Sequence, residues 1–348
     1  MPIFTTEHLA PDSGELKAIN DLSAPPLPTP GKDRTPMIAI SNLSKKFGIV
    51  TAVDAISFEV FEGEIFGLVG LNGAGKTTTM LILSSLLNPT SGSASVCGYD
   101  VMKEKDSVRR SIGFVFEEEA VDIYLTGRQN LDFAARMYSL SRQERERMVA
   151  SVLKTVGLEQ HANSKVRNYS GGMLRRLEIA RGMLTSPRVL LLDEPTIGLD
   201  VQTRRYVWDY IRRTNREMGV TALLATSYLD EADYLCNRIA ILHEGRIIAT
   251  GTPEALKASI GENLIIFKLS KGSPEQFAGL LQDMPWTKSL ESRGNGTFAL
   301  SLKDKSIGIP QIVRMARTHG FGISFIQSSM PSLNDVLLHY TEKGTKGA

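Results

Sequence analysis

The 348-residue chain contains only two cysteines, and features that define several large classes of protein are missing as well. Cys97 and Cys236 lie far apart with no metal-like spacing, so we expect neither a disulfide framework nor a zinc site. Two isolated cysteines fit a reducing, cytosolic setting. The longest apolar runs, such as 189–192, fall well short of the roughly 18 residues that a membrane-spanning helix needs. No charged segment followed by an apolar one opens the chain, which argues against secretion.

An excess of charge of one sign is also missing. Forty Lys and Arg residues against 38 Asp and Glu residues give a net charge of +2, so the composition does not favour a nucleic-acid partner. With 42% hydrophobic and 22% charged residues, the chain has the composition of an ordinary soluble globular protein. Its length suggests two domains, possibly with an additional tail.

Proline is frequent only at the start, where seven of the 15 prolines fall within the first 36 residues. We therefore predict a flexible leader over 1–36, with an ordered arm packed on a partner as the alternative. Strand and helix signals then alternate, which is typical of an α/β domain with a largely parallel sheet. We predict this domain over 37–259, with an inserted helical subdomain at about 117–184. A βαββαβ order over 262–345 suggests a small ferredoxin-like α+β domain.

A glycine-rich loop follows the apolar strand predicted at 65–69 and precedes a helix predicted to run through Leu86. It matches the P-loop pattern, in which backbone N–H groups cradle phosphates, Lys76 reaches the outer phosphates and Thr77 offers a hydroxyl to Mg²⁺. The alternative is a glycine-rich turn that binds nothing, but the strand before and the helix after are the context that a P-loop requires. The predicted ATP-binding residues of this loop are Gly70, Asn72, Gly73, Ala74, Gly75, Lys76, Thr77 and Thr78.

Two carboxylates end the apolar strand predicted at 189–192. Asp193 would hold Mg²⁺ through water, and Glu194 could polarise the water that attacks the terminal phosphate. Taken alone, the segment could also be a buried strand with solvated ends. A P-loop upstream in the same chain favours the catalytic interpretation.

The third motif is Tyr169-Ser-Gly-Gly-Met, followed by Leu-Arg-Arg-Leu-Glu-Ile-Ala-Arg. With it, the chain resembles the nucleotide-binding subunits of ABC transporters over about 38–256. The resemblance implies an α/β P-loop NTPase cassette with a RecA-like core, an antiparallel β subdomain and a helical subdomain. At the predicted helix start, Ser170 and the N–H groups of Gly171 and Gly172 can approach an anion closely. A capped helix start that binds nothing is the alternative.

In the resembled family, this motif faces the ATP held by a second subunit, which implies that two ATPase chains, expected here to be a homodimer, sandwich two nucleotides. Asp200, in the Gly-Leu-Asp stretch at 198–200, is then expected at the dimer seam. Phe47 occupies the place where the family stacks an aromatic ring on adenine. A core Phe is the alternative for that position.

Two departures from the family pattern stand out. Glu117, followed by two more glutamates, replaces the usual Gln; it still offers an oxygen to Mg²⁺ but adds negative charge near the phosphates. The acidic run could instead be a solvated loop. Ser227 replaces the usual switch His and reaches less far toward a γ-phosphate. We therefore expect ATP hydrolysis, with Glu194, Ser227 and Lys76 as catalytic residues, to be slow but present.

The resemblance is closest to the ATPase subunits of exporters whose permease is a separate ABC-2-type membrane protein, including the drug-resistance group. It implies ATP and Mg²⁺ as cofactors, a permease docking near 126–131, no nucleic-acid partner and a peripheral position at the cytoplasmic face of the membrane. The region 262–345 is expected to be accessory. The alternatives are a catalytically silent subunit paired with an active one, and a soluble ABC ATPase outside transport.

Overall fold

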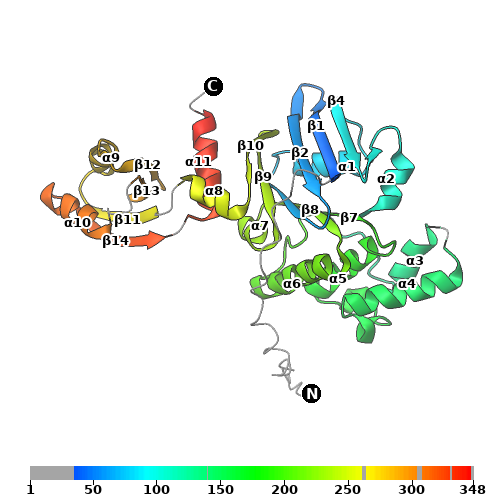
Figure 1. Cartoon of the computed structure of the whole chain (residues 1–348). Helices are drawn as coiled ribbons and strands as arrows, with labels where there is room; N and C mark the ends of the chain where they lie inside the picture. Colours follow the sequence, from blue (N-terminus) through cyan, green and yellow to red (C-terminus); the bar gives the residue numbers. More distant parts are fainter. Residues whose placement is uncertain (1–34, 139, 261–263, 304–307, 330, 346–348) are drawn as a thin grey trace, which may run out of the picture. The chain divides into compact units, whose positions relative to one another are not determined.

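The computed structural model describes residues 35–138, 140–260, 264–303, 308–329 and 331–345 (Figure 1). All but the last two residues of the predicted leader lie outside the described residues. The described chain forms three sheets, of four, six and four strands. The cassette contains the first two sheets, and the third belongs to the C-terminal region.

The six-stranded sheet has the order β10-β9-β3-β8-β7-β6. All neighbours in it pair in parallel except β10, which is antiparallel to β9. Leu190 and Leu192 face one side of the sheet, whereas Leu191 and Leu223 face the other, and all four side chains are buried. Burial of both faces explains why these strands are almost continuously apolar. The strands are β3 (Ile65–Val69), β6 (Ile112–Val115), β7 (Val189–Asp193), β8 (Thr221–Thr226), β9 (Arg238–His243) and β10 (Arg246–Gly251).

An antiparallel sheet of order β2-β1-β4-β5 covers one face of the central sheet, with α1 (Lys76–Leu83) between them. α1 ends three residues before the predicted Leu86, because Ser85 adopts a positive φ of 59° that an α-helix cannot contain. α2 (Lys105–Ser111) leads into β6. The strands of this sheet are β1 (Pro36–Phe47), β2 (Val50–Phe61), β4 (Ser91–Val96) and β5 (Tyr99–Asp100).

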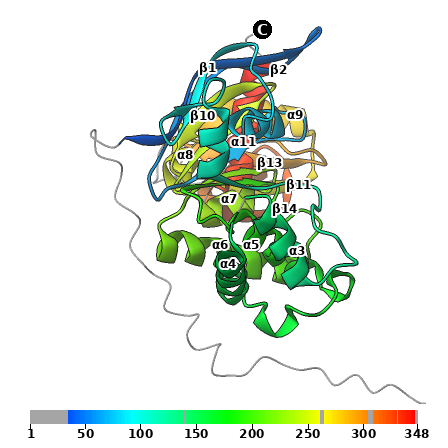
Figure 2. The same ribbon diagram turned by 90° about the vertical axis from the view of Figure 1, so that its right-hand side faces the viewer.

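Helices cover the opposite face of the central sheet, as Figure 2 shows for α5 (Gly171–Gly182) and α6 (Val201–Met218). Between β6 and β7, the described residues form helices and connecting loops, and their one β-type pairing is a single bridge between Thr126 and Lys165. α3 (Gly127–Arg136) and α4 (Arg142–Thr155) each begin with a capping box, at Thr126 and Ser141. The remaining helices of the cassette are η1 (Glu159–His161), η2 (Val166–Asn168), α7 (Leu229–Leu235) and α8 (Pro253–Ile260).

The third sheet has the order β12-β13-β11-β14 and is antiparallel throughout. With helices after its first and third strands, this is the predicted ferredoxin-like arrangement. Its elements are β11 (Leu264–Lys271), α9 (Pro274–Gln282), β12 (Thr287–Ser292), β13 (Thr297–Leu302), α10 (Ile309–Thr318) and β14 (Gly322–Ser329). The final segment forms a 13-residue helix, α11 (Leu333–Thr345). Leu333, Val336 and Leu337 of α11 belong to the same apolar cluster as α8.

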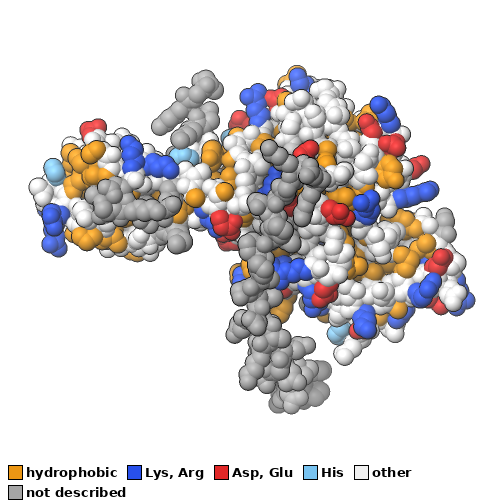
Figure 3. Space-filling model, viewed as in Figure 1, with side chains coloured by type: hydrophobic (Ala, Val, Ile, Leu, Met, Phe, Trp, Pro, Cys, Tyr) orange, Lys and Arg blue, Asp and Glu red, His pale blue; other side chains and the backbone are white. Residues whose placement is uncertain are grey.

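None of the helices in the described ranges is both long and apolar enough to traverse a bilayer. Figure 3 shows lysine, arginine and acidic side chains interspersed over the visible face of the cassette. This distribution agrees with the nearly balanced charge of the sequence.

Candidate nucleotide site

The P-loop connects β3 to α1, and other backbone segments approach two of its glycines, Gly70 and Gly75, too closely for a side chain. A Cβ on Gly75, which has a φ of 108°, would lie 2.3 Å from the Ala52 carbonyl oxygen of β2. A Cβ on Gly70 would lie 2.2 Å from the Leu242 carbonyl oxygen of β9. Both separations are too short for any side chain. The loop is therefore held between the β1–β2 hairpin and the carboxyl end of the central sheet.

Lys76, the first residue of α1, is 5% exposed and folds back over this loop. Its Nζ donates to the Gly70 carbonyl at 2.8 Å and to the Leu71 carbonyl at 3.3 Å. Nζ also lies 3.1 Å from Oε1 of Glu194, an ion-pair distance, although the angle is poor for a hydrogen bond. The cation thus contacts the P-loop and the Glu194 carboxylate at the same time.

Asp193 ends β7 and is 1% exposed, with an Oδ1 atom that has no hydrogen-bond partner. Burial raises the pKa of Asp193 to about 6, although a hydrogen bond with Thr77 acts in the opposite direction. The negative charges of Glu194 and Glu117 also raise this pKa. A buried carboxylate with a free oxygen beside a hydroxyl is a chemically suitable donor set for Mg²⁺ that arrives with phosphates.

Glu194 follows Asp193 and has a φ of 45°, an unfavourable conformation for a residue with a long side chain. Its Oε2 accepts two hydrogen bonds from Ser227, one from the backbone N–H at 3.1 Å and one from the hydroxyl at 3.2 Å. Ser227 follows β8, so adjacent parallel strands bring the two residues together. In this structure, the serine hydroxyl therefore orients Glu194.

The second group of predicted residues lies at the starts of α5 and α6. Ser170 caps α5 by accepting from the Met173 N–H at 3.3 Å, and Asp200 caps α6 by accepting from the Gln202 and Thr203 N–H groups. A Cβ on Gly172 would lie 2.5 Å from the Thr203 side chain. The two helix starts are thus in contact. Within the described residues, no hydrogen bond joins Ser170 to the P-loop.

Phe47 and Glu117 are both at the surface. Phe47, at the tip of the β1–β2 hairpin, is 50% exposed and has Lys45 Nζ 4.9 Å from its ring centroid, so it is not a core residue. Glu117 is exposed, as are the two glutamates that follow it. Its contribution near the site is the charge that acts on Asp193.

Sequence reasoning missed two buried polar clusters around the site. The Arg175 guanidinium contacts the Glu178 carboxylate at 2.6 Å and lies against the backbone after β7. Glu231, with no exposed surface, accepts hydrogen bonds from Thr196 and Trp208, each at 2.7 Å. Burial is the main cause that raises the pKa of Glu231. The three-residue spacing of Arg175 and Glu178 signals a helical ion pair, but nothing in the sequence signals its burial.

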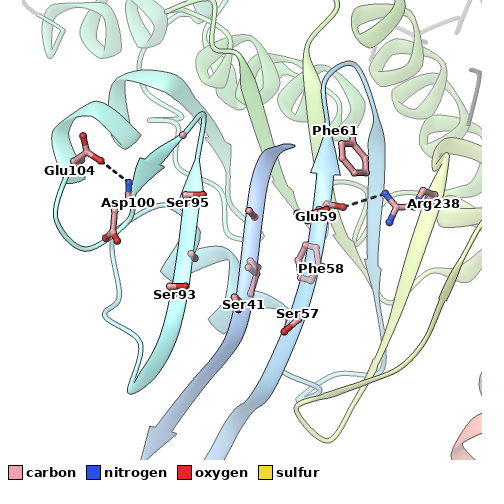
Figure 4. Close-up of a pocket in the computed structure, with 14 residues that line it drawn as sticks. Ser41, Ser57, Phe58, Glu59, Phe61, Ser93, Ser95, Asp100, Glu104 and Arg238 are labelled. Atoms are coloured by element: carbon pink, nitrogen blue, oxygen red, sulfur yellow. Dashed lines mark hydrogen bonds between the residues drawn. The ribbon is translucent and has the colours of Figure 1, made fainter. Parts of the chain in front are cut away.

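A hollow elsewhere on the cassette is not the nucleotide site. It lies on the solvent face of the first sheet, where Figure 4 shows Ser41, Ser57 and Ser93 from three neighbouring strands. Arg238 borders it and donates to the Glu59 carbonyl. None of the predicted site residues lines this hollow.

Comparison with known proteins identifies the chain. The family model described as "ABC transporter" matches residues 53–197. The chain is similar to the daunorubicin/doxorubicin resistance ATP-binding protein DrrA of Streptomyces peucetius, with 37% identity over 309 residues, covering 88% of this chain and 93% of that protein. It is 34% identical to the linearmycin resistance ATP-binding protein LnrL of Bacillus subtilis, covering 88% of this chain and 98% of the relative.

A solved dimeric ATP-binding cassette in a post-hydrolysis state, bound to ADP and Pi, has 29% identity and a TM-score of 0.56. The match covers 62% of this chain and 98% of the cassette. These matches confirm the predicted P-loop cassette fold and its ATPase activity. The chain therefore belongs to the ABC transporter family, as an ATP-binding subunit with an ATP-hydrolysing cassette.

Proposed function

We propose that two copies of this chain bind two ATP molecules between them and hydrolyse them to drive export through a separate ABC-2-type permease. The observation that carries the catalytic part is the convergence of Lys76, Asp193 and Glu194 at the carboxyl end of β7, beside the P-loop. Each of the three side chains is almost fully buried. Charges in a water-poor site act on phosphates more strongly than exposed charges do.

In this proposal, each residue has a defined task. The loop Gly70 to Thr78 holds the phosphates with its N–H groups, and Lys76 exchanges the Gly70 and Leu71 carbonyls for phosphate oxygens. Glu194 accepts the proton of the attacking water, and Ser227 holds its carboxylate in place. Phe47 offers its exposed ring to adenine.

Thr77, Asp193 and, from the rim, Glu117 would hold Mg²⁺. The unpartnered Asp193 Oδ1 supports this assignment, because a buried carboxylate with a pKa of about 6 gains most from a nearby cation. When bound, the ion would neutralise charge that develops on the phosphate oxygens.

The second nucleotide contact comes from the partner copy. Ser170, Gly171, Gly172 and Asp200 would face the ATP held by the other chain. This arrangement is supported by the contact between the starts of α5 and α6, which presents one continuous surface of helix N-termini. The solved dimer among the similar structures supports dimerisation.

We infer the permease partner and the direction of transport from relatives of this chain. They include a Nod factor export ATP-binding protein of Rhizobium meliloti at 34% identity. An exposed apolar patch in the helical subdomain supports docking of a membrane protein: Ile123, Tyr124, Phe133, Met137 and Tyr138 are 42–72% exposed. Docking there would place the chain at the cytoplasmic face of the membrane. We further propose the domain limits 37–259 and 262–345, with the C-terminal domain as an accessory unit.

Phosphate release by the purified chain tests the catalytic part. We expect slow, Mg²⁺-dependent release that Glu194→Gln abolishes while ATP binding persists. Glu254→Gln, on the solvent-exposed side of α8, is the control and is expected to leave the rate unchanged. Release that does not depend on Glu194 would contradict the proposal.

A further inference from the structure

Arg175 is a buried cation that contacts backbone atoms from two separate segments of the cassette. It lies on α5, is 7% exposed, and has Glu178 as its counter-charge at 2.6 Å. Four further acceptors are backbone carbonyls rather than side chains. They are Phe116 at 2.8 Å, Asp193 at 3.1 Å, Glu194 at 3.1 Å and Pro195 at 2.5 Å.

Three of these carbonyls belong to the turn that carries the catalytic carboxylate. Glu194 has a φ of 45°, which a non-glycine residue maintains only where its surroundings hold it. The Ala225 carbonyl accepts from the Glu194 N–H at 2.8 Å, and Arg175 donates to the carbonyl of Asp193 in the same peptide unit and to the carbonyl of Glu194 in the next one. Arg175 is therefore one of the groups that hold the turn in its strained conformation.

The fourth carbonyl lies directly before Glu117. Glu178 binds the other end of the segment that begins at Phe116. Its carboxylate oxygen Oε1, which is not the one that contacts Arg175, accepts from the Ala120 N–H at 2.8 Å. Arg181, one turn further along α5, donates to the Ala120 carbonyl at 3.2 Å. One face of α5 thus holds both ends of the segment from Phe116 to Ala120.

We propose that Arg175 is a positioning residue for hydrolysis, which holds the Glu194 turn in the same chain and links it to the Glu117 segment. This inference rests on the proposed hydrolysis by a dimer. Among the described residues, Arg175 forms no hydrogen bond or ion pair with a predicted phosphate-binding residue of the P-loop, so it acts on the catalytic carboxylate and not on nucleotide affinity. Its planar set of donors reaches acceptors in several directions, which the single ammonium group of a lysine cannot do.

The first experiment compares Arg175→Lys with wild type. The substitution keeps a positive charge beside Glu178, so the buried pair is retained. We expect kcat to fall by at least about tenfold, with the Kd and KM for ATP within about twofold of wild type. Arg238→Lys is the matched control: Arg238 pairs with Glu64 at 3.2 Å and donates to a backbone carbonyl, but lies at the opposite, amino-terminal end of the strands.

Mixed dimers separate an effect within one chain from an effect on the partner's site. In a dimer of an Arg175→Lys chain with a Glu194→Gln chain, the only catalytic carboxylate belongs to the Arg175→Lys chain. The α5 helix that faces this site comes from the other chain, in which Arg175 is unchanged. We expect this site to be as slow as the Arg175→Lys homodimer. In the converse dimer, both substitutions lie in one chain and the other chain is wild type. We expect its competent site to work at the wild-type rate per site.

A second variant removes the buried charges together. Arg175→Met with Glu178→Leu leaves no unpaired charge, so the fold is expected to persist, and hydrolysis is expected to fall by about 100-fold with ATP binding retained. Unchanged kcat in both variants, or slow turnover only in the converse mixed dimer, would overturn the inference. Absence of phosphate release from wild type would instead refute the proposed function.

Discussion

Lys76 and Glu194 form a buried ion pair at the centre of the nucleotide site, with Nζ 3.1 Å from Oε1 and side chains only 5% and 3% exposed. Two carboxylates, Asp193 and Glu194, share the neighbourhood of this one ammonium group. Lys76 is therefore the cation that offsets the burial of two carboxylates, besides being the residue proposed to contact phosphates. This double role makes its contribution to stability measurable apart from catalysis.

Lys76→Met is expected to lower the free energy of unfolding by about 3–5 kcal/mol at neutral pH, because it leaves two buried carboxylates without their cation. The loss is expected to shrink under acidic conditions, where Asp193, whose pKa is about 6, becomes protonated and neutral. Urea unfolding measured across pH checks this. Lys257→Met is the control; its ion pair with Asp233 is 25% and 35% exposed, and its loss is expected to cost under about 1 kcal/mol.

Ser227 contacts Glu194 through both its amide and its hydroxyl, and only the hydroxyl is removed by Ser227→Ala. Loss of one hydrogen bond from a neutral hydroxyl to a charged carboxylate, about 1.5 kcal/mol, is expected to reduce kcat by about tenfold. ATP affinity should not change, because the bond made in this structure is to the carboxylate. Steady-state kinetics together with equilibrium ATP binding separate the two effects. A parallel loss of affinity would show that the serine contacts the nucleotide directly.

The motifs and their supporting elements could be predicted from the sequence, because each is a local pattern. The P-loop between β3 and α1, and the carboxylates at the end of β7, follow from apolar runs and the residues that end them. The backbone partners of Arg175 and the Glu194 partner of Ser227 could not be predicted, since they lie between 18 and 59 positions away along the chain. The packing of α11 on α8 could not be predicted either, because the contacting residues are far apart in the sequence: Ser259 of α8 and Tyr340 of α11 lie 81 positions apart.

Ser170 allows the partner contact to be tested without disturbing the helix. Aspartate caps a helix as well as serine does, so Ser170→Asp is expected to leave α5 and the melting temperature intact. The added charge would face the phosphates bound by the partner copy, and ATP-dependent dimerisation is expected to fall by about tenfold or more. Light scattering after gel filtration with ATP measures this. Ser141→Asp, at the cap of α4, is the control and should dimerise normally.

Glu231, which is not one of the proposed metal-binding residues, provides a test of how the stability of the fold depends on pH. Burial raises the pKa of its carboxyl above the usual glutamate value of about 4.5, so the folded state retains a proton that the unfolded state releases. Stability from this group is therefore fully present below about pH 4.5 and is lost as pH rises through the folded-state pKa. Glu231→Gln removes this dependence and can still accept from Thr196 and Trp208.

We expect the melting temperature of Glu231→Gln relative to wild type to increase with pH above about 4.5 and then to level off. Calorimetry over that range measures the difference. Glu275→Gln, an exposed residue at the start of α9, serves as the control. A difference that is constant with pH would contradict a raised pKa for Glu231.

Val336 tests whether α11 stabilises the cassette as well as the C-terminal region. It has no exposed surface and belongs to the apolar cluster that contains Leu256 and Ile260 of α8. Val336→Asp buries an unpaired charge there and is expected to cost about 3 kcal/mol or more. Leu338 lies on the same helix with 43% of its side chain exposed, and Leu338→Asp should cost below about 1 kcal/mol.

Because α8 follows directly from β10 of the central sheet, Val336→Asp should also lower the temperature at which ATP binding is lost. If ATP binding were retained to the wild-type temperature, α11 would not contribute to the stability of the nucleotide site.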